Sequence, residues 1–599
     1  MLDYLIQNTF VIDGAGKQGF QGSVGIENDR IAVVSHDPAL SIPAETVIDG
    51  KGLVTCPGFI DIHSHADLAL PDDPTGEDFL LQGITSYLGG HCGLGKAPAE
   101  GTFLKEFKAG SSGSYFTDKA DTATFDGWLT TCAPNGTGPN YGAMVGGDPI
   151  RGGVMGMNYT RAASEKEKER MTALLDEALD AGAFGFSMNR DVCVPGYWAD
   201  DDEIVRLLKR VERRNALFAP HTRYHQNSWY STEENECTYG LFNDHPGEVI
   251  TGRMHGLMEA VEFARMVPGL RLMISHITPI YYIPQPHPDY VDEMLARTSL
   301  EEIIEKPRAD GVDVTFCMIP SDDSIGTSLF VSDLFFHKRQ ETLWPEFYKK
   351  GGKAAFLENL GDRAFRDSIT RYCNSGRMKM SMACPATDPY WSECFTIVKC
   401  ADPKYVGKTV YELALERAPI RRVQAVYREA YEVLYDILMA DPNAVCAFCK
   451  DKREYHTHSV FLRHPCGMPM TDSQSMSAAR LKTLNPENPG FAPSTYCMFP
   501  RYLLQTVKQD KVMDLPEAIR KITALPASVA GFAERGLLRE KMFADVVVMD
   551  WNHLTAYHDY LHPDRGVEGI QYVFVNGKLA CKDGQVINNQ AGRVLRRGK

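Results

Sequence analysis

The residues with the clearest chemical potential are two histidines at the end of an apolar run, Gly58-Phe-Ile-Asp-Ile-His-Ser-His65. Side chains two positions apart along a strand point to the same face, so His63 and His65 would lie side by side. Two imidazoles on one face can bind one metal ion. An isolated His-x-His pair is usually two ordinary histidines, but the flanking segments Pro57–Asp61 and Ala66–Asp67 favour the metal interpretation here.

Four more side chains of metal-binding type follow other apolar runs: Cys92, His221, His276 and Asp472. Each is a weak signal alone, because a lone histidine at a strand end is more often a structural hydrogen-bonding group and a lone cysteine usually packs in the core. Together they predict one site in which histidine, cysteine and aspartate side chains converge.

The elements that must position these residues alternate between helices and strands. The helices expected in the middle of the chain cover residues 165–182, 200–215 and 258–266, and the strands that follow them cover 183–187, 216–219 and 270–275. Repeated strand–helix units predict a parallel sheet with both faces covered. A (β/α)8 TIM-like barrel is the leading interpretation, since its functional residues lie at the carboxyl ends of the strands. A doubly wound sheet is the alternative, but the glycine fingerprint of a dinucleotide site is missing.

The two ends of the chain have a different pattern, rich in short β runs and turns such as Asn576-Gly577. They predict a small β-sandwich domain formed from both chain termini, residues 1–56 and 535–599. The metal-dependent barrel would cover 57–534. Residues from about 330 to 460 fit the barrel pattern poorly, so we expect an insertion there.

The composition is that of a large globular protein, with 599 residues, 44% hydrophobic and 24% charged. A net charge of −15 disfavours nucleic acid and anionic membranes as partners. The 15 cysteines are spread along a chain without a secretion-signal pattern, which predicts reduced thiols. No apolar run approaches the ~20 residues of a membrane-spanning helix. We therefore expect a cytoplasmic protein that acts on a small molecule, with no nucleic-acid or membrane partner.

An ordered set of motifs resembles the D-aminoacylase (N-acyl-D-amino-acid deacylase) family of the amidohydrolase superfamily, over nearly the whole chain. The motifs are PGFIDIHSHAD from residue 57, LQGITSYLGGHCGLGKAP from residue 81, APHTRYH from residue 219, ISH at 274–276, and the closing stretch from Phe499 through EAIRKITALPASVAGFAERGLLREKMFADVVVMD to YVFVNGK.

This resemblance implies a zinc-dependent amidohydrolase and gives roles to matching positions. The metal ligands would be His63, His65, Cys92, His221 and His276, with Cys92 where most relatives of the superfamily carry a carboxylated lysine. Asp472 would act first as general base and then as general acid. The expected cofactor is Zn²⁺, one ion bound tightly and a second, weaker divalent ion left open. A homo-oligomer is also compatible with the resemblance.

Three departures from the family pattern concern the substrate. His276 is followed by Ile277 and Thr278 where the family has a lysine, and Gly490–Thr495 lacks the family's arginine. Thr471-Asp472-Ser473 replaces the usual Ser-Asp-Gly. Because a buried carboxylate without a charge partner is costly, the two missing cations argue against a plain N-acyl-D-amino acid.

The predicted function is therefore hydrolysis of an amide-type C–N bond, in an N-acyl amino acid or a related amide. A cyclic amidohydrolase of the hydantoinase or dihydroorotase kind is one alternative, and a non-catalytic scaffold relative is another. Arg190 and Arg223 are candidates for a relocated substrate-binding cation, with a structural ion pair as the alternative role of Arg223. Tyr282 is a candidate for the lining of the substrate pocket.

Overall fold

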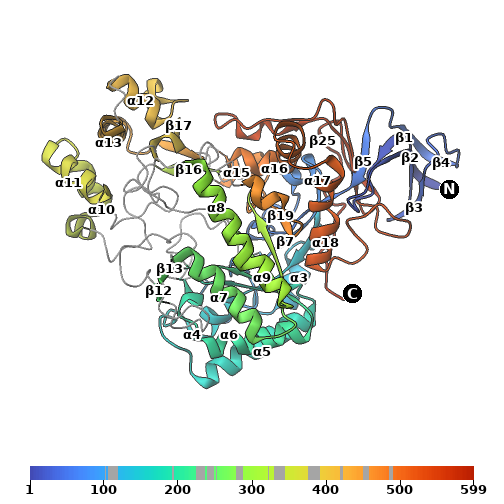
Figure 1. Cartoon of the computed structure of the whole chain (residues 1–599), viewed down its shortest axis with the longest axis horizontal. Coiled ribbons are helices and arrows are strands. Elements are labelled where there is room, and N and C mark those ends of the chain that lie inside the picture. Colours follow the sequence, from blue (N-terminus) through green and yellow to red (C-terminus); the bar gives the residue numbers. More distant parts are fainter. Residues whose placement is uncertain are drawn as a thin grey trace.

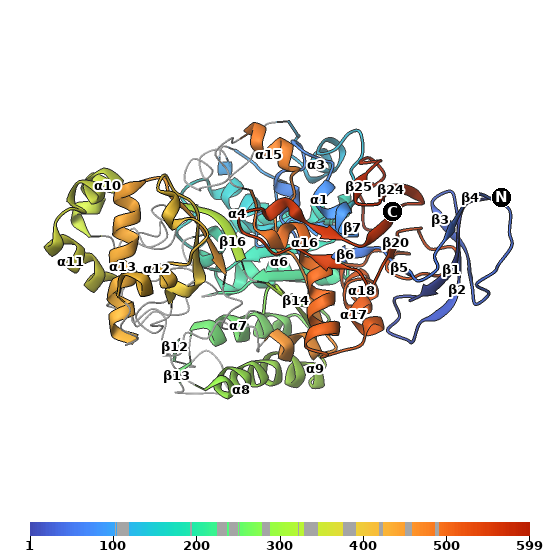
Figure 2. The same ribbon diagram turned by 90° about the horizontal axis from the view of Figure 1, so that it is seen from above.

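The computed structural model is a mixed α/β structure whose parallel strands lie between two unlike ends (Figures 1 and 2). An N-terminal group of strands lies at one end and a group of helices from residues 345–440 at the other. The residues described are 1–101, 103–104, 119–191, 194–223, 237–238, 249–250, 252–277, 288–321, 323–328, 345–374, 391–418, 423–449, 458–484 and 490–598.

The central strands form a three-stranded and a six-stranded parallel sheet. The smaller sheet has the order β6 (Phe59–Asp61), β7 (Ile84–Gly89), β8 (Asn140–Ala143). The larger has the order β19 (Gly467–Pro469), β15 (Asp313–Met318), β14 (Arg271–Ile274), β11 (Leu217–His221), β10 (Gly185–Asn189), β9 (Val145–Gly146). Only Met144 separates β8 from β9, so the two sheets run into each other. Within the described residues, strand pairing does not join β19 to β6.

Helices alternate with these strands, as the sequence predicts. The helices of this region are α5 (Glu165–Ala181), α6 (Asp201–Arg213), α7 (Gly252–Met266), α8 (Asp289–Leu300) and α9 (Lys306–Ala309). Ser164 begins α5 with a capping box to Glu167, and Gly182 ends it in the left-handed conformation at φ 112°. The predicted range for α5 is therefore confirmed to within a residue, whereas α7 begins earlier than predicted, at Gly252.

The strands from both ends of the chain form one nine-stranded sheet. Its members are β1 (Leu2–Val11), β2 (Phe20–Glu27), β3 (Arg30–Ser35), β4 (Ala44–Asp49), β5 (Val54–Pro57), β20 (Val546–Met549), β23 (Ile570–Val575), β24 (Lys578–Lys582) and β25 (Gln585–Val586). Asn576 and Gly577 make the predicted hairpin turn, both with positive φ. β5 and β20 pair directly, so the strands of both chain ends belong to one hydrogen-bonded sheet. Apolar side chains of β1, β2, β20 and β23 share one core.

The described part of the predicted insertion has a hydrophobic core of its own. Its elements are β16 (Asp323–Ser328), β17 (Phe395–Lys399), β18 (Val445–Cys449), α10 (Glu346–Asn359), α11 (Arg363–Asn374), α12 (Val410–Arg417) and α13 (Val423–Ala440). Trp391, Tyr431 and Phe448 are buried in this core, which is separate from the core around the parallel strands. A separate core explains why these residues do not follow the strand–helix pattern. Among the described helices, none has the length and apolarity needed to cross a membrane.

Candidate metal centre

The carboxyl ends of five parallel strands bring together all six side chains singled out as metal ligands or general base. His63 and His65 follow β6, Cys92 follows β7, His221 ends β11, His276 follows β14 and Asp472 follows β19. Carboxyl ends of parallel strands lie at one edge of a sheet, where functional residues of such folds converge. Their ligand atoms form two overlapping groups that share Cys92, and within each group all ligand atoms lie within 4.8 Å of one another.

The first group contains His63, His65, Cys92 and Asp472. The Asp472 carboxylate lies between the two imidazoles, with Oδ1 3.0 Å from Nε2 of His63 and 3.1 Å from Nε2 of His65. The Cys92 Sγ is 3.4 Å from Nε2 of His63. His63 is fully buried.

The second group contains Cys92, His221 and His276, all buried. The Cys92 Sγ is 3.7 Å from Nε2 of His276. Oδ2 of Asp472 is 3.4 Å from the same nitrogen, so His276 faces both groups. Cys92 and His276 therefore lie between the two groups, which suits a pair of neighbouring ions.

Two of these residues have unusual backbone conformations. Cys92 and Asp472 have φ of 51° and 50°, in the left-handed region that residues other than glycine seldom adopt. Gly90 makes the turn before Cys92 possible, because a Cβ there would lie 2.3 Å from the carbonyl oxygen of Met144. Left-handed non-glycine residues that persist in a fold are concentrated at functional sites.

Burial and the neighbouring imidazoles set the protonation states in this cluster. Burial lowers the pKa of His63 and so favours the neutral imidazole, the form that binds metals. Burial alone would raise the pKa of Asp472, but His276 and His63 hold it well below its usual range. Asp472 is therefore a carboxylate at neutral pH.

The donor set fits a divalent transition metal. Imidazole nitrogen, thiolate sulfur and carboxylate oxygen are the ligand types of zinc. Ligand atoms bound to one tetrahedral zinc ion at ordinary bond lengths lie about 3.3 to 3.7 Å apart. The nitrogen–sulfur and nitrogen–oxygen separations given above run from 3.0 to 3.7 Å, so these side chains can hold an ion with small adjustments.

Three side chains next to the candidate ligands were not predicted from the sequence. The His91 ring stacks on the His63 ring at a centroid distance of 4.0 Å. The Cys317 Sγ lies 3.7 Å from Nδ1 of His63. Oδ2 of the buried Asp191 is 3.5 Å from Nε2 of His221. Asp191 and Cys317 lie at or near strand ends, so the rule that located the ligands would also have flagged them.

The two arginines predicted as substrate contacts both donate to Glu259 of α7. Arg190 donates to its two carboxylate oxygens at 2.6 and 3.2 Å and also to the carbonyl oxygens of Gly196 and Ala199, with 3% of its side chain exposed. Arg223 donates from Nε to Glu259 at 2.9 Å and lies over the Tyr197 ring, with 14% exposed. No sequence pattern pointed to Glu259, because a glutamate in a helix is usually a solvent-facing residue. Tyr282 lies outside the described residues.

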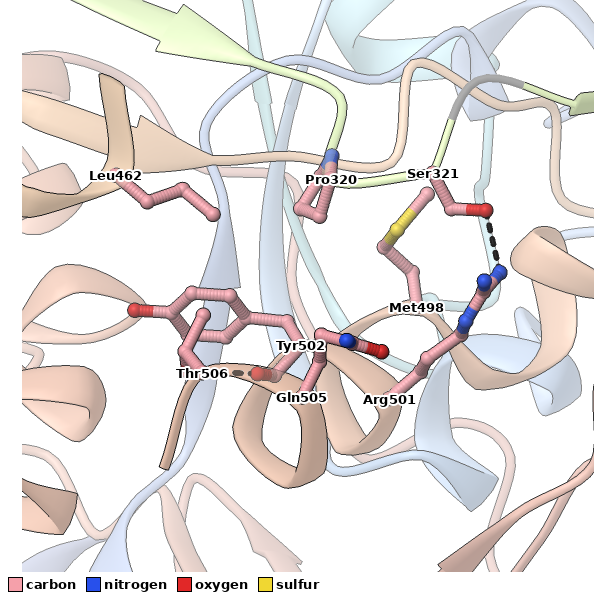
Figure 3. Close-up of a pocket in the computed structure, with 8 residues that line it drawn as sticks. All are labelled: Pro320, Ser321, Leu462, Met498, Arg501, Tyr502, Gln505 and Thr506. Atoms are coloured by element: carbon pink, nitrogen blue, oxygen red, sulfur yellow. Dashed lines mark hydrogen bonds between the residues drawn. The ribbon is translucent and has the colours of Figure 1, made fainter. Parts of the chain in front are cut away.

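A small cavity near the end of β15 is too small for a substrate. Pro320, Ser321, Met498, Arg501 and Tyr502 line part of it, and the Arg501 guanidinium donates to the Ser321 hydroxyl (Figure 3). Its volume of about 10 Å³ has room for about one water molecule.

Comparison with known proteins points to one group of enzymes. No family model matches the chain. N-acyl-D-glutamate deacylase from Alcaligenes xylosoxydans xylosoxydans is 26% identical over 599 residues, covering all of this chain and 97% of the relative. A D-aminoacylase crystal structure, from work on its binuclear metal centre, superposes with a TM-score of 0.67 at 23% identity, covering all of both chains. The chain is therefore similar over its full length to N-acyl-D-amino-acid deacylases, among them a D-aminoacylase from Alcaligenes xylosoxydans xylosoxydans that is 24% identical and is covered to 98%.

Two further solved structures show which kind of amidohydrolase this fold resembles more. N-acyl-D-glutamate deacylase from Bordetella bronchiseptica, solved with zinc and a phosphonate inhibitor that mimics the tetrahedral intermediate, superposes with a TM-score of 0.66 at 22% identity and 99% coverage of both chains. A D-hydantoinase superposes less well, with a TM-score of 0.52 at 14% identity. The fold is therefore closer to that of the linear-amide deacylases than to that of this cyclic amidohydrolase.

Proposed function

We propose that this protein is a metal-dependent hydrolase of an amide-type C–N bond, and that its substrate is an N-acyl amino acid or a closely related amide. The observation that carries the proposal is the six-residue cluster, in which Cys92 lies between two groups of ligands and Asp472 faces three imidazoles. The full-length similarity to N-acyl-D-glutamate deacylase supports the choice of bond.

The residues of the cluster have distinct roles in this proposal. His63, His65, Cys92, His221 and His276 hold the metal, one Zn²⁺ tightly and a second divalent ion more weakly. A divalent ion bound there lowers the pKa of water and polarises a carbonyl group. Asp472 accepts a proton from the attacking water and returns it to the leaving nitrogen. A carboxylate whose pKa is well below its usual range is ionised and ready for the first step at neutral pH.

The scaffold in this proposal is a (β/α)8 barrel. Taking β8 and β9 as one strand leaves eight parallel strands from β6 to β19 within the described residues. Residues 57–534 would form this catalytic domain, with an insertion around 330–460, and residues 1–56 and 535–599 the β-domain. The hydrophobic core around Trp391 and Tyr431 supports the insertion, and the core shared by β1, β2, β20 and β23 supports the β-domain. Other β-domain side chains, including Val547 and Val573, pack in the core of the parallel strands.

Arg223 is the better of the two arginine candidates for a contact with the substrate. It lies two residues beyond His221, and its side chain is more exposed than that of Arg190. Four hydrogen bonds already occupy the Arg190 guanidinium. We propose that Arg223 binds a carboxylate or another electron-rich group of the substrate in place of the missing family cations.

A paired hydrolysis screen tests the proposal. The purified protein, loaded with Zn²⁺, is assayed on N-acetyl-D-glutamate, N-acetyl-D-methionine and amides of the same size without a carboxylate, and every assay is repeated after chelation. We expect hydrolysis that is lost on chelation and restored by Zn²⁺. The proposal would be overturned if the protein hydrolysed none of the linear amides in a metal-dependent way but cleaved a cyclic amide such as a hydantoin.

A further inference from the structure

The end of β6 and the end of β19 are held together by hydrogen bonds of the residues that follow the strands. Asp472 donates its N–H to the carbonyl oxygen of His63 at 3.1 Å. Ser473 accepts from the His65 N–H at 2.9 Å and from the Ser64 hydroxyl at 3.1 Å. These contacts join two ligand-bearing segments that are more than 400 residues apart in the chain.

The side chains of Asp61 and Thr471 form a second connection beneath the first. The Asp61 carboxylate accepts from the Thr471 N–H at 3.1 Å, from the Thr471 hydroxyl and from the His63 N–H at 3.3 Å. Asp61 is fully buried and Thr471 is 4% exposed. One carboxylate thus binds the backbone of a ligand residue and the residue directly before Asp472.

The Thr471 hydroxyl also fixes the other side of Asp472. It accepts from the Ser473 N–H at 3.2 Å while it donates to Asp61. Asp472 therefore lies between two residues held by the same hydroxyl group. This arrangement accounts for its left-handed backbone at φ 50°, which a free chain would seldom adopt.

We propose that the Asp61–Thr471 pair is a positioning device that holds Asp472 between the imidazoles of His63 and His65. It acts through the backbone and touches neither substrate nor metal. The inference rests on the proposed function for the role of Asp472, but the geometry that it explains does not depend on that role. Residues that orient ligands from behind affect metal affinity or activity by about 10- to 100-fold when they are changed.

Thr471→Val is the decisive variant, since valine keeps the shape and the backbone N–H but removes the hydroxyl. We expect kcat on the best amide substrate to fall about 10- to 100-fold with KM nearly unchanged. Thr471→Ser restores the hydroxyl and should recover most of the activity. Thr85→Val is the matched control, because Thr85 is a fully buried threonine that donates to the Phe59 carbonyl oxygen on β6 and should leave kcat unaltered.

A second measurement separates this inference from the proposed function. Zn²⁺ alone is titrated against a chromophoric chelator in the wild type and in each variant. We expect Thr471→Val to weaken the site of His63, His65 and Asp472 while the site of Cys92, His221 and His276 keeps its affinity. If the wild type hydrolyses no amide, the proposed function fails, yet this loss of Zn²⁺ affinity would still support the positioning role. If Thr471→Val binds Zn²⁺ and turns over substrate as the wild type does, the positioning role is overturned.

Discussion

Two mostly buried carboxylates, Asp472 and Glu259, have opposite kinds of neighbours. Asp472 faces the imidazoles of His63, His65 and His276, at 3.0 to 3.4 Å. Glu259 faces the guanidinium groups of Arg190 and Arg223, at 2.6 and 2.9 Å. In both clusters a carboxylate oxygen lies within ion-pair distance of nitrogen atoms. Both clusters lie close to His221, because its ring contacts the His276 ring and its carbonyl oxygen accepts from the Arg190 N–H.

The difference between the two clusters lies in the lone pairs of their partners. A neutral imidazole offers a lone pair and can bind a cation, whereas a guanidinium group only donates. The Asp472 cluster is therefore able to hold a metal ion. The Glu259 cluster keeps two fixed positive charges beside it, one of them partly exposed.

The largest expected effect comes from Asp472→Asn, which removes the general base but keeps the shape of the side chain. We expect kcat to fall about 1,000-fold, because proton transfer to and from the substrate is lost. Steady-state assays at saturating substrate measure it, and metal analysis should still find an ion at Cys92, His221 and His276. Turnover close to that of the wild type would show that another group moves the proton.

Cys92→Ser tests whether one side chain serves both groups of ligands. A hydroxyl is a far weaker ligand than a thiolate, so Zn²⁺ affinity should fall about 100-fold, and activity should fall with it at limiting metal. Competition with a chelator gives the affinity. Cys132→Ser is the control, because Cys132 is also buried but belongs to neither group. Equal losses in both variants would indicate a general effect of removing a buried thiol.

Glu259→Gln addresses the second cluster, where the charge should matter for substrate binding and not for the metal. We expect KM for a carboxylate-bearing amide to rise about 10-fold, as Arg223 loses its fixed orientation, while Zn²⁺ affinity stays the same. Glu262→Gln is the control on the same helix, since Glu262 pairs with the more exposed Arg265. If Glu259→Gln loses metal, the Glu259 cluster also affects metal binding, and the proposed difference between the two clusters is wrong.

The smallest effects should come from Arg223→Lys and Arg190→Lys, compared with each other. We expect Arg223→Lys to raise KM about threefold at unchanged melting temperature, because lysine keeps the charge but loses the forked geometry. Arg190→Lys should instead lower the melting temperature by a few degrees at unchanged KM, since its hydrogen bonds are internal. The reverse result would assign the substrate contact to Arg190.

The sequence alone predicted the helices and strands of the middle of the chain and the six residues that the structure brings together in the candidate metal centre. Capping residues such as Ser164 and Glu167 encode the start of α5 locally. Strand-end positions of His221 and His276 follow from short apolar runs, and the motifs around His63 and Cys92 are contiguous in the chain. Local signals of this kind are readable because they depend on neighbours in the chain.

Only the tertiary structure decided which distant residues meet. The direct pairing of β5 with β20 joins the strands of the two chain ends, and no local pattern encodes such a pairing. Glu259 reaches Arg190 and Arg223 from α7, which packs against α6 and β14. Asp61 and Thr471 are 410 positions apart. Contacts of this kind arise when whole helices and strands are buried and pack together. The spacing of residues along the chain does not predict them.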